Sequence, residues 1–114
     1  MPLAQLTDDE RALVFECLKC VAAGNVILHD WEFQTIMGIE VKDFLKVVAK
    51  WPDVDEAEET VFLAINNSLN NLLGYPHGKH SKWSEYVSAS QSEVARVFAK
   101  WRGEPVSGYF NGIR

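Results

Sequence analysis

Apolar residues recur at intervals of three and four along most of this chain, and glycine or proline interrupts the pattern between segments. Side chains with this spacing lie on one face of an α-helix, so each segment predicts an amphipathic helix with one buried face. The pattern covers residues 8–23, 30–37 and 40–51, a fourth segment ending at 73, and a fifth ending at 101. We therefore predict an all-α fold, a single-domain bundle of four to five amphipathic helices over residues 1–114.

Polar residues mark where two of these helices begin. Thr7 and Glu10 match a capping box, in which a hydroxyl and a carboxylate each accept a hydrogen bond from the first-turn backbone. Ser90 and Glu93 repeat the same spacing before the last helix. Both helices are therefore expected to start immediately after their capping residue.

Two regions fall outside the helical pattern. Residues 75–88 predict a long loop before the last helix, and residues 104–114 predict an irregular C-terminal tail. Tyr109 and Phe110 are apolar, so we expect this tail to dock on the core. Residues 26–28 are apolar and partly β-branched, which leaves a short strand as an alternative there, although no partner strand is evident.

The composition is that of an ordinary globular domain. Hydrophobic residues make up 47% and charged residues 24% of the 114-residue chain. A chain of this length buries about two-thirds of its unfolded surface, so it needs no disulfide or metal to fold. No apolar run approaches the roughly 18 to 20 residues of a membrane span. The first seven residues lack the basic start and apolar core of a secretory signal, which predicts a cytoplasmic protein with no membrane partner.

Charge is distributed unevenly along the chain. The net charge is −5, but residues 1–59 hold 13 acidic and 5 basic side chains (net −8), whereas residues 60–114 hold 3 acidic and 6 basic ones (net +3). An acidic chain is a poor general binder of nucleic acid, because phosphates attract lysine and arginine. An acidic face suits a basic protein partner instead. The residues expected on that face are Asp53, Asp55, Glu56 and Glu59.

The fourth predicted helix and the loop after it contain the least expected residues. The helix carries four asparagines, Asn66, Asn67, Asn70 and Asn71. Each costs the helix roughly half a kcal/mol or more relative to alanine. The loop holds two of the three histidines with lysines, a tyrosine and a tryptophan, a mixture typical of binding loops. The candidate binding residues are Asn67, Asn71, Tyr75, His77, His80 and Trp83. The structural alternative is that these side chains anchor the loop to the core.

Metal binding and nucleophilic catalysis are less favoured. Cys17, Cys20, His77 and His80 are four potential zinc ligands, but the two pairs are separated by far more residues than in known zinc-binding patterns. Cys17 lies on the apolar face of the first helix, so both thiols are expected to be unreactive core residues. We therefore predict no metal, no cofactor and no catalytic residue.

A helix-turn-helix is a further alternative. Residues 32–39 and the helix after them have its outline, with Gly38 at the turn. However, Gln34 stands where a small residue should pack between the two helices, and acidic neighbours offset the lysines of the second one. Because reading DNA needs a basic footprint, an ordinary helix corner is favoured and nucleic acid is not an expected partner.

A helical domain with no convincing acid–base pair or nucleophile is expected to act through its surface. The preferred hypothesis is a protein-interaction module, of the inhibitor or immunity type, that binds a basic protein. The alternative is a small-ligand-binding protein or an enzyme that uses the Asn71–Trp83 segment, which a concave pocket near His77 and Trp83 would favour. A homodimer is left open.

Overall fold

The computed structural model, which describes residues 2–75 and 77–104, contains five α-helices and two short 3-10 helices around an apolar core. The α-helices are α1 (Asp8–Ala22), α2 (Phe33–Met37), α3 (Val41–Lys50), α4 (Glu59–Gly74) and α5 (Gln91–Arg102). The 3-10 helices are η1 (Pro2–Gln5) and η2 (His80–Glu85). The predicted all-α bundle is confirmed. No strand occurs in the described ranges, so residues 26–28 are not the short strand considered as an alternative.

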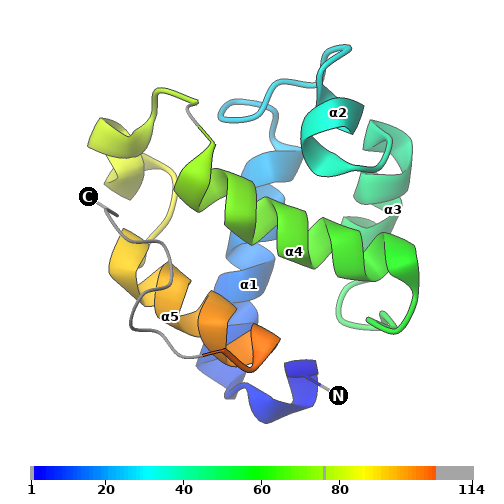
Figure 1. Cartoon of the computed structure of the whole chain (residues 1–114), viewed down its shortest axis with the longest axis vertical. Helices are drawn as coiled ribbons and strands as arrows, with labels where there is room; N and C mark the ends of the chain where they lie inside the picture. The colour runs from blue at the N-terminus through cyan, green and yellow to red at the C-terminus, as the bar shows by residue number, and fades with distance from the viewer. Residues whose placement is uncertain (1, 76, 105–114) are drawn as a thin grey trace.

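Helix α4 is the centre of the bundle. It contacts each of the other four α-helices, and Figure 1 shows it lying across α1, with α2 and α3 on one side and α5 on the other. Its buried residues are Val61, Ala64, Ile65, Ser68, Leu69, Leu72 and Leu73. Because α4 buries such a broad face, the polar residues along it meet neighbouring elements rather than solvent alone.

The capping residues behave differently at the two predicted boxes. At α1, Thr7 Oγ1 accepts from the Glu10 amide at 3.1 Å, and Glu10 Oε1 accepts from the Thr7 amide at 2.8 Å, so this box is complete. At α5, Ser90 Oγ accepts from the Glu93 amide, but the Glu93 carboxylate binds Arg96 instead of the cap. The second box is therefore only half formed.

The Glu10 carboxylate also joins α1 to α5. It accepts hydrogen bonds from Lys100 Nζ at 2.7 Å and from an Arg96 guanidinium nitrogen at 2.9 Å. These partners and the Thr7 amide stabilise the charged form, Lys100 most of all, and lower the pKa of Glu10 to about 2. The charged Glu10 carboxylate therefore links α1 to α5 at neutral pH, and this link is lost when the carboxylate is protonated in acid.

Two large apolar residues on the helices are partly exposed. Leu45 on α3 is 41% exposed and Phe62 on α4 is 42% exposed. Helix α3 contacts α1 and α4, and its buried residues are Phe44 and Val47. The surface of the bundle therefore carries scattered apolar side chains, which is normal for a small domain.

The remaining expectations concern the ends of the chain and the membrane. Tyr109 and Phe110, expected to dock the tail, lie outside the described residues. Within the described ranges, none of the helices has both the length and the apolar character needed to cross a membrane.

Candidate functional site

Two of the predicted binding residues, Asn67 and Asn71, hold α2 against α4. Asn67 Nδ2 donates to the Met37 carbonyl at 2.8 Å, and Asn71 Nδ2 donates to the Ile36 carbonyl at 3.0 Å. These carbonyls belong to the last turn of α2, where the helix provides no backbone donor. The asparagines therefore have a structural role here, and their participation in binding stays a prediction.

Gly38 makes this arrangement sterically possible. It ends α2 in the left-handed conformation with φ of 74°. A Cβ atom at this position would lie 3.2 Å from Asn67 Nδ2. Glycine is therefore favoured at residue 38 both by its backbone angle and by the closeness of the asparagine that caps α2.

The two loop histidines cap the C-terminal end of α4. His77 Nε2 lies 2.8 Å from the Leu72 carbonyl, and His80 Nε2 lies 2.9 Å from the Leu73 carbonyl. Their rings stack with centroids 4.2 Å apart. Both carbonyls lie in the last turn of the helix, so the loop folds back and satisfies acceptors that would otherwise lack a partner.

His77 is held in one neutral tautomer. Its Nδ1 accepts a hydrogen bond from the Lys79 amide at 3.0 Å, so the hydrogen is on Nε2 and is donated to Leu72. Burial of the ring is the main cause that lowers the pKa of His77 below its ordinary value. With both nitrogens engaged, His77 is not placed to act as a general base or as a metal ligand.

Trp83 lies inside the structure. Its indole ring is buried, and its Nε1 donates to the Ala89 carbonyl at 2.7 Å. It therefore anchors η2 and the approach to α5. Of the six predicted binding residues, Tyr75 and His77 line one pocket together.

The predicted acidic surface is only partly present. Asp53, Asp55 and Glu59 are exposed, but Glu56 is 7% exposed, so the prediction that Glu56 belongs to this surface is wrong. Glu56 Oε2 accepts from Trp101 Nε1 at 2.8 Å, and Oε1 accepts from the Leu3 amide at 2.9 Å. Two donors from separate elements draw this carboxylate inward, an effect that a run of acidic residues does not reveal.

Both cysteines are free thiols, Cys17 buried and Cys20 half-buried. Burial raises the pKa of Cys17 far above its ordinary value and, with Glu16 nearby, raises the pKa of Cys20 to about 11. Both thiols are therefore protonated and unreactive at neutral pH. Across residues 2–75 and 77–104, no three histidine, cysteine or acidic side chains lie close enough together to hold a metal ion.

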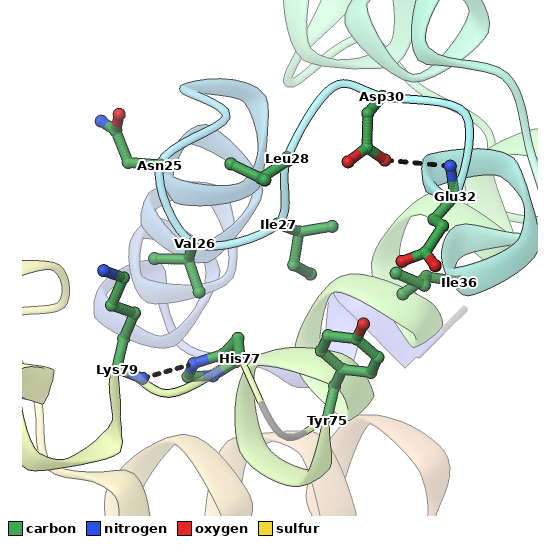
Figure 2. Close-up of a pocket in the computed structure, with 10 residues that line it drawn as sticks. All are labelled: Asn25, Val26, Ile27, Leu28, Asp30, Glu32, Ile36, Tyr75, His77 and Lys79. Carbon is green, nitrogen blue, oxygen red and sulfur yellow. Dashed lines mark hydrogen bonds between the residues drawn. The ribbon is translucent and has the colours of Figure 1, made fainter.

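A pocket of about 330 Å³ lies between the α1–α2 connector and the turn after α4. One wall comes from the connector and the start of α2, and the other from the turn. Figure 2 shows Asp30, Glu32 and the Tyr75 hydroxyl toward one side of it, and Lys79 and His77 toward the other. The residues lining it are Asn25, Val26, Ile27, Leu28, Asp30, Glu32, Ile36, Tyr75, His77 and Lys79.

The connector is fixed from beneath by its buried residues. Val26 and Ile27 are part of the core. His29 lies edge-on to Phe33, with ring centroids 5.3 Å apart, and its Nε2 is 3.3 Å from the Val21 carbonyl at the end of α1. These contacts order the connector without using Trp31.

Trp31 is instead turned toward solvent. It is 83% exposed, and Leu28 in the same connector is 59% exposed. Trp31 stands between Asp30 and Glu32, both of which line the pocket. These three residues are not among the binding candidates that the sequence indicated. The signal that could have identified them is a tryptophan between two acidic residues that belongs to no apolar helix face.

The charges of the pocket are not neutralised internally. Among the described residues, Asp30, Glu32 and Lys79 form no ion pair. Asp30 Oδ1 accepts from the Glu32 amide at 2.9 Å, which leaves the rest of that carboxylate open to solvent. The pocket therefore has an acidic side and a basic side, each available to a ligand.

Comparison of the chain with protein-family models, with curated proteins and with solved structures gave no match in any of the three.

Proposed function

We propose that this protein is an interaction module that binds a basic protein partner, in the manner of a small inhibitor or immunity protein. The partner contacts the Trp31 surface, which we define as Leu28, Asp30, Trp31 and Glu32 with the pocket residues Tyr75 and Lys79. The observation that supports this most is the 83% exposure of Trp31, whose sequence neighbours Asp30 and Glu32 both line a pocket of about 330 Å³.

The exposure of Trp31 has no explanation in the fold. The connector is already anchored by Val26, Ile27 and His29. A tryptophan in water forgoes one of the largest apolar burials available to a side chain. Tryptophan is also the residue type most enriched among interface positions that dominate binding energy. A solvent-facing Trp31 next to exposed Leu28 therefore supports a protein-binding surface.

Charge supports a basic partner. Asp30 and Glu32 flank Trp31 and lack an ion-pair partner among the described residues. They belong to the half of the sequence, residues 1–59, that has 13 acidic and 5 basic side chains. Complementary charge steers association and suppresses wrong partners, so this surface favours a positively charged protein.

A small-ligand site is the second candidate, because Tyr75 and His77, two residues of the Asn71–Trp83 segment, line the pocket. Its volume is at the lower end of the range for ligand pockets, roughly 300 to 1,000 Å³. Against catalysis, both ring nitrogens of His77 are engaged. The helix-turn-helix alternative has less support, since α2 has only five residues.

The proposal is tested by capturing partners from the cells that produce this protein, using three immobilised forms. These are the wild type, Trp31→Ala, and Leu45→Ala as a matched control that removes an exposed apolar side chain elsewhere. We expect one basic protein, identified by mass spectrometry, to bind the wild type and Leu45→Ala and to be lost with Trp31→Ala. Equal capture by all three forms, or capture of no specific protein, would contradict the proposal.

A further inference from the structure

The pocket beside Trp31 has a chemical polarity that indicates what part of a partner enters it. Its acidic side has two carboxylates, Asp30 and Glu32, at the exposed edge, with the Tyr75 ring and the Ile36 side chain beneath them. Its other side has the Lys79 ammonium and the neutral His77 ring. The opening is therefore negative, aromatic and apolar at one side and positive at the other.

We propose that the acidic side of this pocket binds one arginine side chain of the partner, an inference that rests on the proposed function of the same surface. The guanidinium lies between the Asp30 and Glu32 carboxylates, and its methylene stem packs against Ile36 and Tyr75. Lys79, across the pocket, hydrogen-bonds to a backbone carbonyl or carboxylate of the same partner segment.

Arginine fits this setting better than lysine. A guanidinium has five N–H donors in a flat fork, so it can serve two carboxylates at once. It is more weakly hydrated than an ammonium and stacks on aromatic rings. The two carboxylates and the Tyr75 ring line the same pocket and provide both kinds of contact, whereas an ammonium lacks the planar fork.

Lys79 limits the occupant to one cation. It forms no ion pair among the described residues and lies on the opposite side from Asp30 and Glu32. A second basic group in the pocket would meet Lys79 without compensation, and like charges in one site are destabilising. The favoured partner segment therefore has an isolated arginine rather than a cluster of basic residues.

The experiment is an NMR titration of the ¹⁵N-labelled protein with three blocked peptides, N-acetyl-Gly-Arg-Gly-amide and its lysine and citrulline analogues. Citrulline has nearly the shape of arginine without its charge. Peptide is added to about 10 mM, because a small ligand with a few exposed contacts binds in the millimolar range. We expect the arginine peptide to shift amides of residues 25–32, 75 and 77–79, the lysine peptide to bind several-fold more weakly, and the citrulline peptide to cause no shift there.

Two charge-removing variants complete the experiment. Asp30→Asn keeps the Oδ1 atom that accepts from the Glu32 amide, so the double variant Asp30→Asn/Glu32→Gln should keep the fold. We expect this double variant to bind the arginine peptide about fivefold to tenfold more weakly than the wild type does. The control Asp53→Asn/Glu59→Gln removes the same charge from the other exposed acidic surface and should leave binding unchanged.

The arginine assignment is overturned if the arginine peptide shifts amides in neither segment, or if the citrulline or lysine peptide binds as tightly as the arginine peptide. It is also overturned if both double variants weaken binding of the arginine peptide equally. Its failure is distinguishable from failure of the proposed function. If the captured partner is lost with Trp31→Ala but still binds Asp30→Asn/Glu32→Gln at full affinity, the Trp31 surface is confirmed and the arginine assignment is wrong.

Discussion

Substitution of the α4 asparagines tests whether Asn67 and Asn71 hold α2 against α4. Asn67 and Asn71 each donate one hydrogen bond to a carbonyl of the last turn of α2, at 2.8 and 3.0 Å. Replacing either by aspartate removes the donor and puts a carboxylate oxygen against a carbonyl oxygen. Asn70, on the same helix, is exposed. Asn70→Asp is therefore a control with the same change in charge and nearly the same helix propensity.

The expected magnitude follows from the lost contacts. Leaving a buried or half-buried polar group without its partner costs about 1 to 3 kcal/mol. We expect a loss of that size for Asn67→Asp and for Asn71→Asp, and less than about 0.5 kcal/mol for Asn70→Asp, since exposed substitutions have small effects. Against a total of about 5 to 15 kcal/mol for a domain, the difference is large.

Urea unfolding followed by circular dichroism measures the difference. With a slope of about 1 to 3 kcal/mol per molar for a protein this small, the midpoints of Asn67→Asp and Asn71→Asp should fall by roughly 1 M relative to Asn70→Asp. If all three variants unfold at the same midpoint, the asparagines do not hold α2 against α4. Their use in binding, as the sequence first indicated, would then become the better interpretation.

Three further predictions concern titratable and buried groups. Glu56→Ala leaves the buried Trp101 Nε1–H and the half-buried Leu3 amide without an acceptor and should cost about 2 to 4 kcal/mol in urea unfolding, whereas Glu58→Ala, at an exposed neighbour, should cost little. The pKa of Glu10 is about 2 in the folded protein and near 4.5 when unfolded, so its stabilisation is complete above about pH 4.5 and is lost as the pH falls toward 2. In Glu10→Gln, this part of the pH dependence should disappear. The folded-state pKa of His77 lies below 6.5, so the unfolded chain binds its proton first and stability should fall as the pH drops below about 6.5. His77→Gln should flatten that slope, and an unchanged slope would show that another group causes it.

The elements of this fold that depend on local sequence were predictable. The complete capping box at Thr7 and Glu10 and the buried face of α1 follow from residue spacing alone. The half-formed box at Ser90 shows the limit, because Arg96 competes for the Glu93 carboxylate through the next helical turn. Local sequence patterns indicate which residues can form a contact, but they do not predict which of two available partners a side chain will bind.

Contacts across the chain could not be predicted. In the sequence, Glu56 is one more acid in an exposed run, and its two donors, the Leu3 amide and Trp101 Nε1, lie 53 and 45 residues away along the chain. Likewise, the partners of Asn71 are 34 and 35 residues earlier. The pocket was missed for the same reason, since it joins the connector before α2 to the turn after α4, and only the second segment had been singled out.

The affinity of the captured partner for Trp31→Ala, measured by titration calorimetry beside wild type and Leu45→Ala, tests the central claim most directly. Because Trp31 is 83% exposed, its removal should leave the unfolding midpoint unchanged, so any loss of affinity reports on the interface. If Trp31 dominates that interface, the account predicts binding weaker by about 30-fold or more for Trp31→Ala and unchanged for Leu45→Ala. Equal affinities for all three proteins would contradict it.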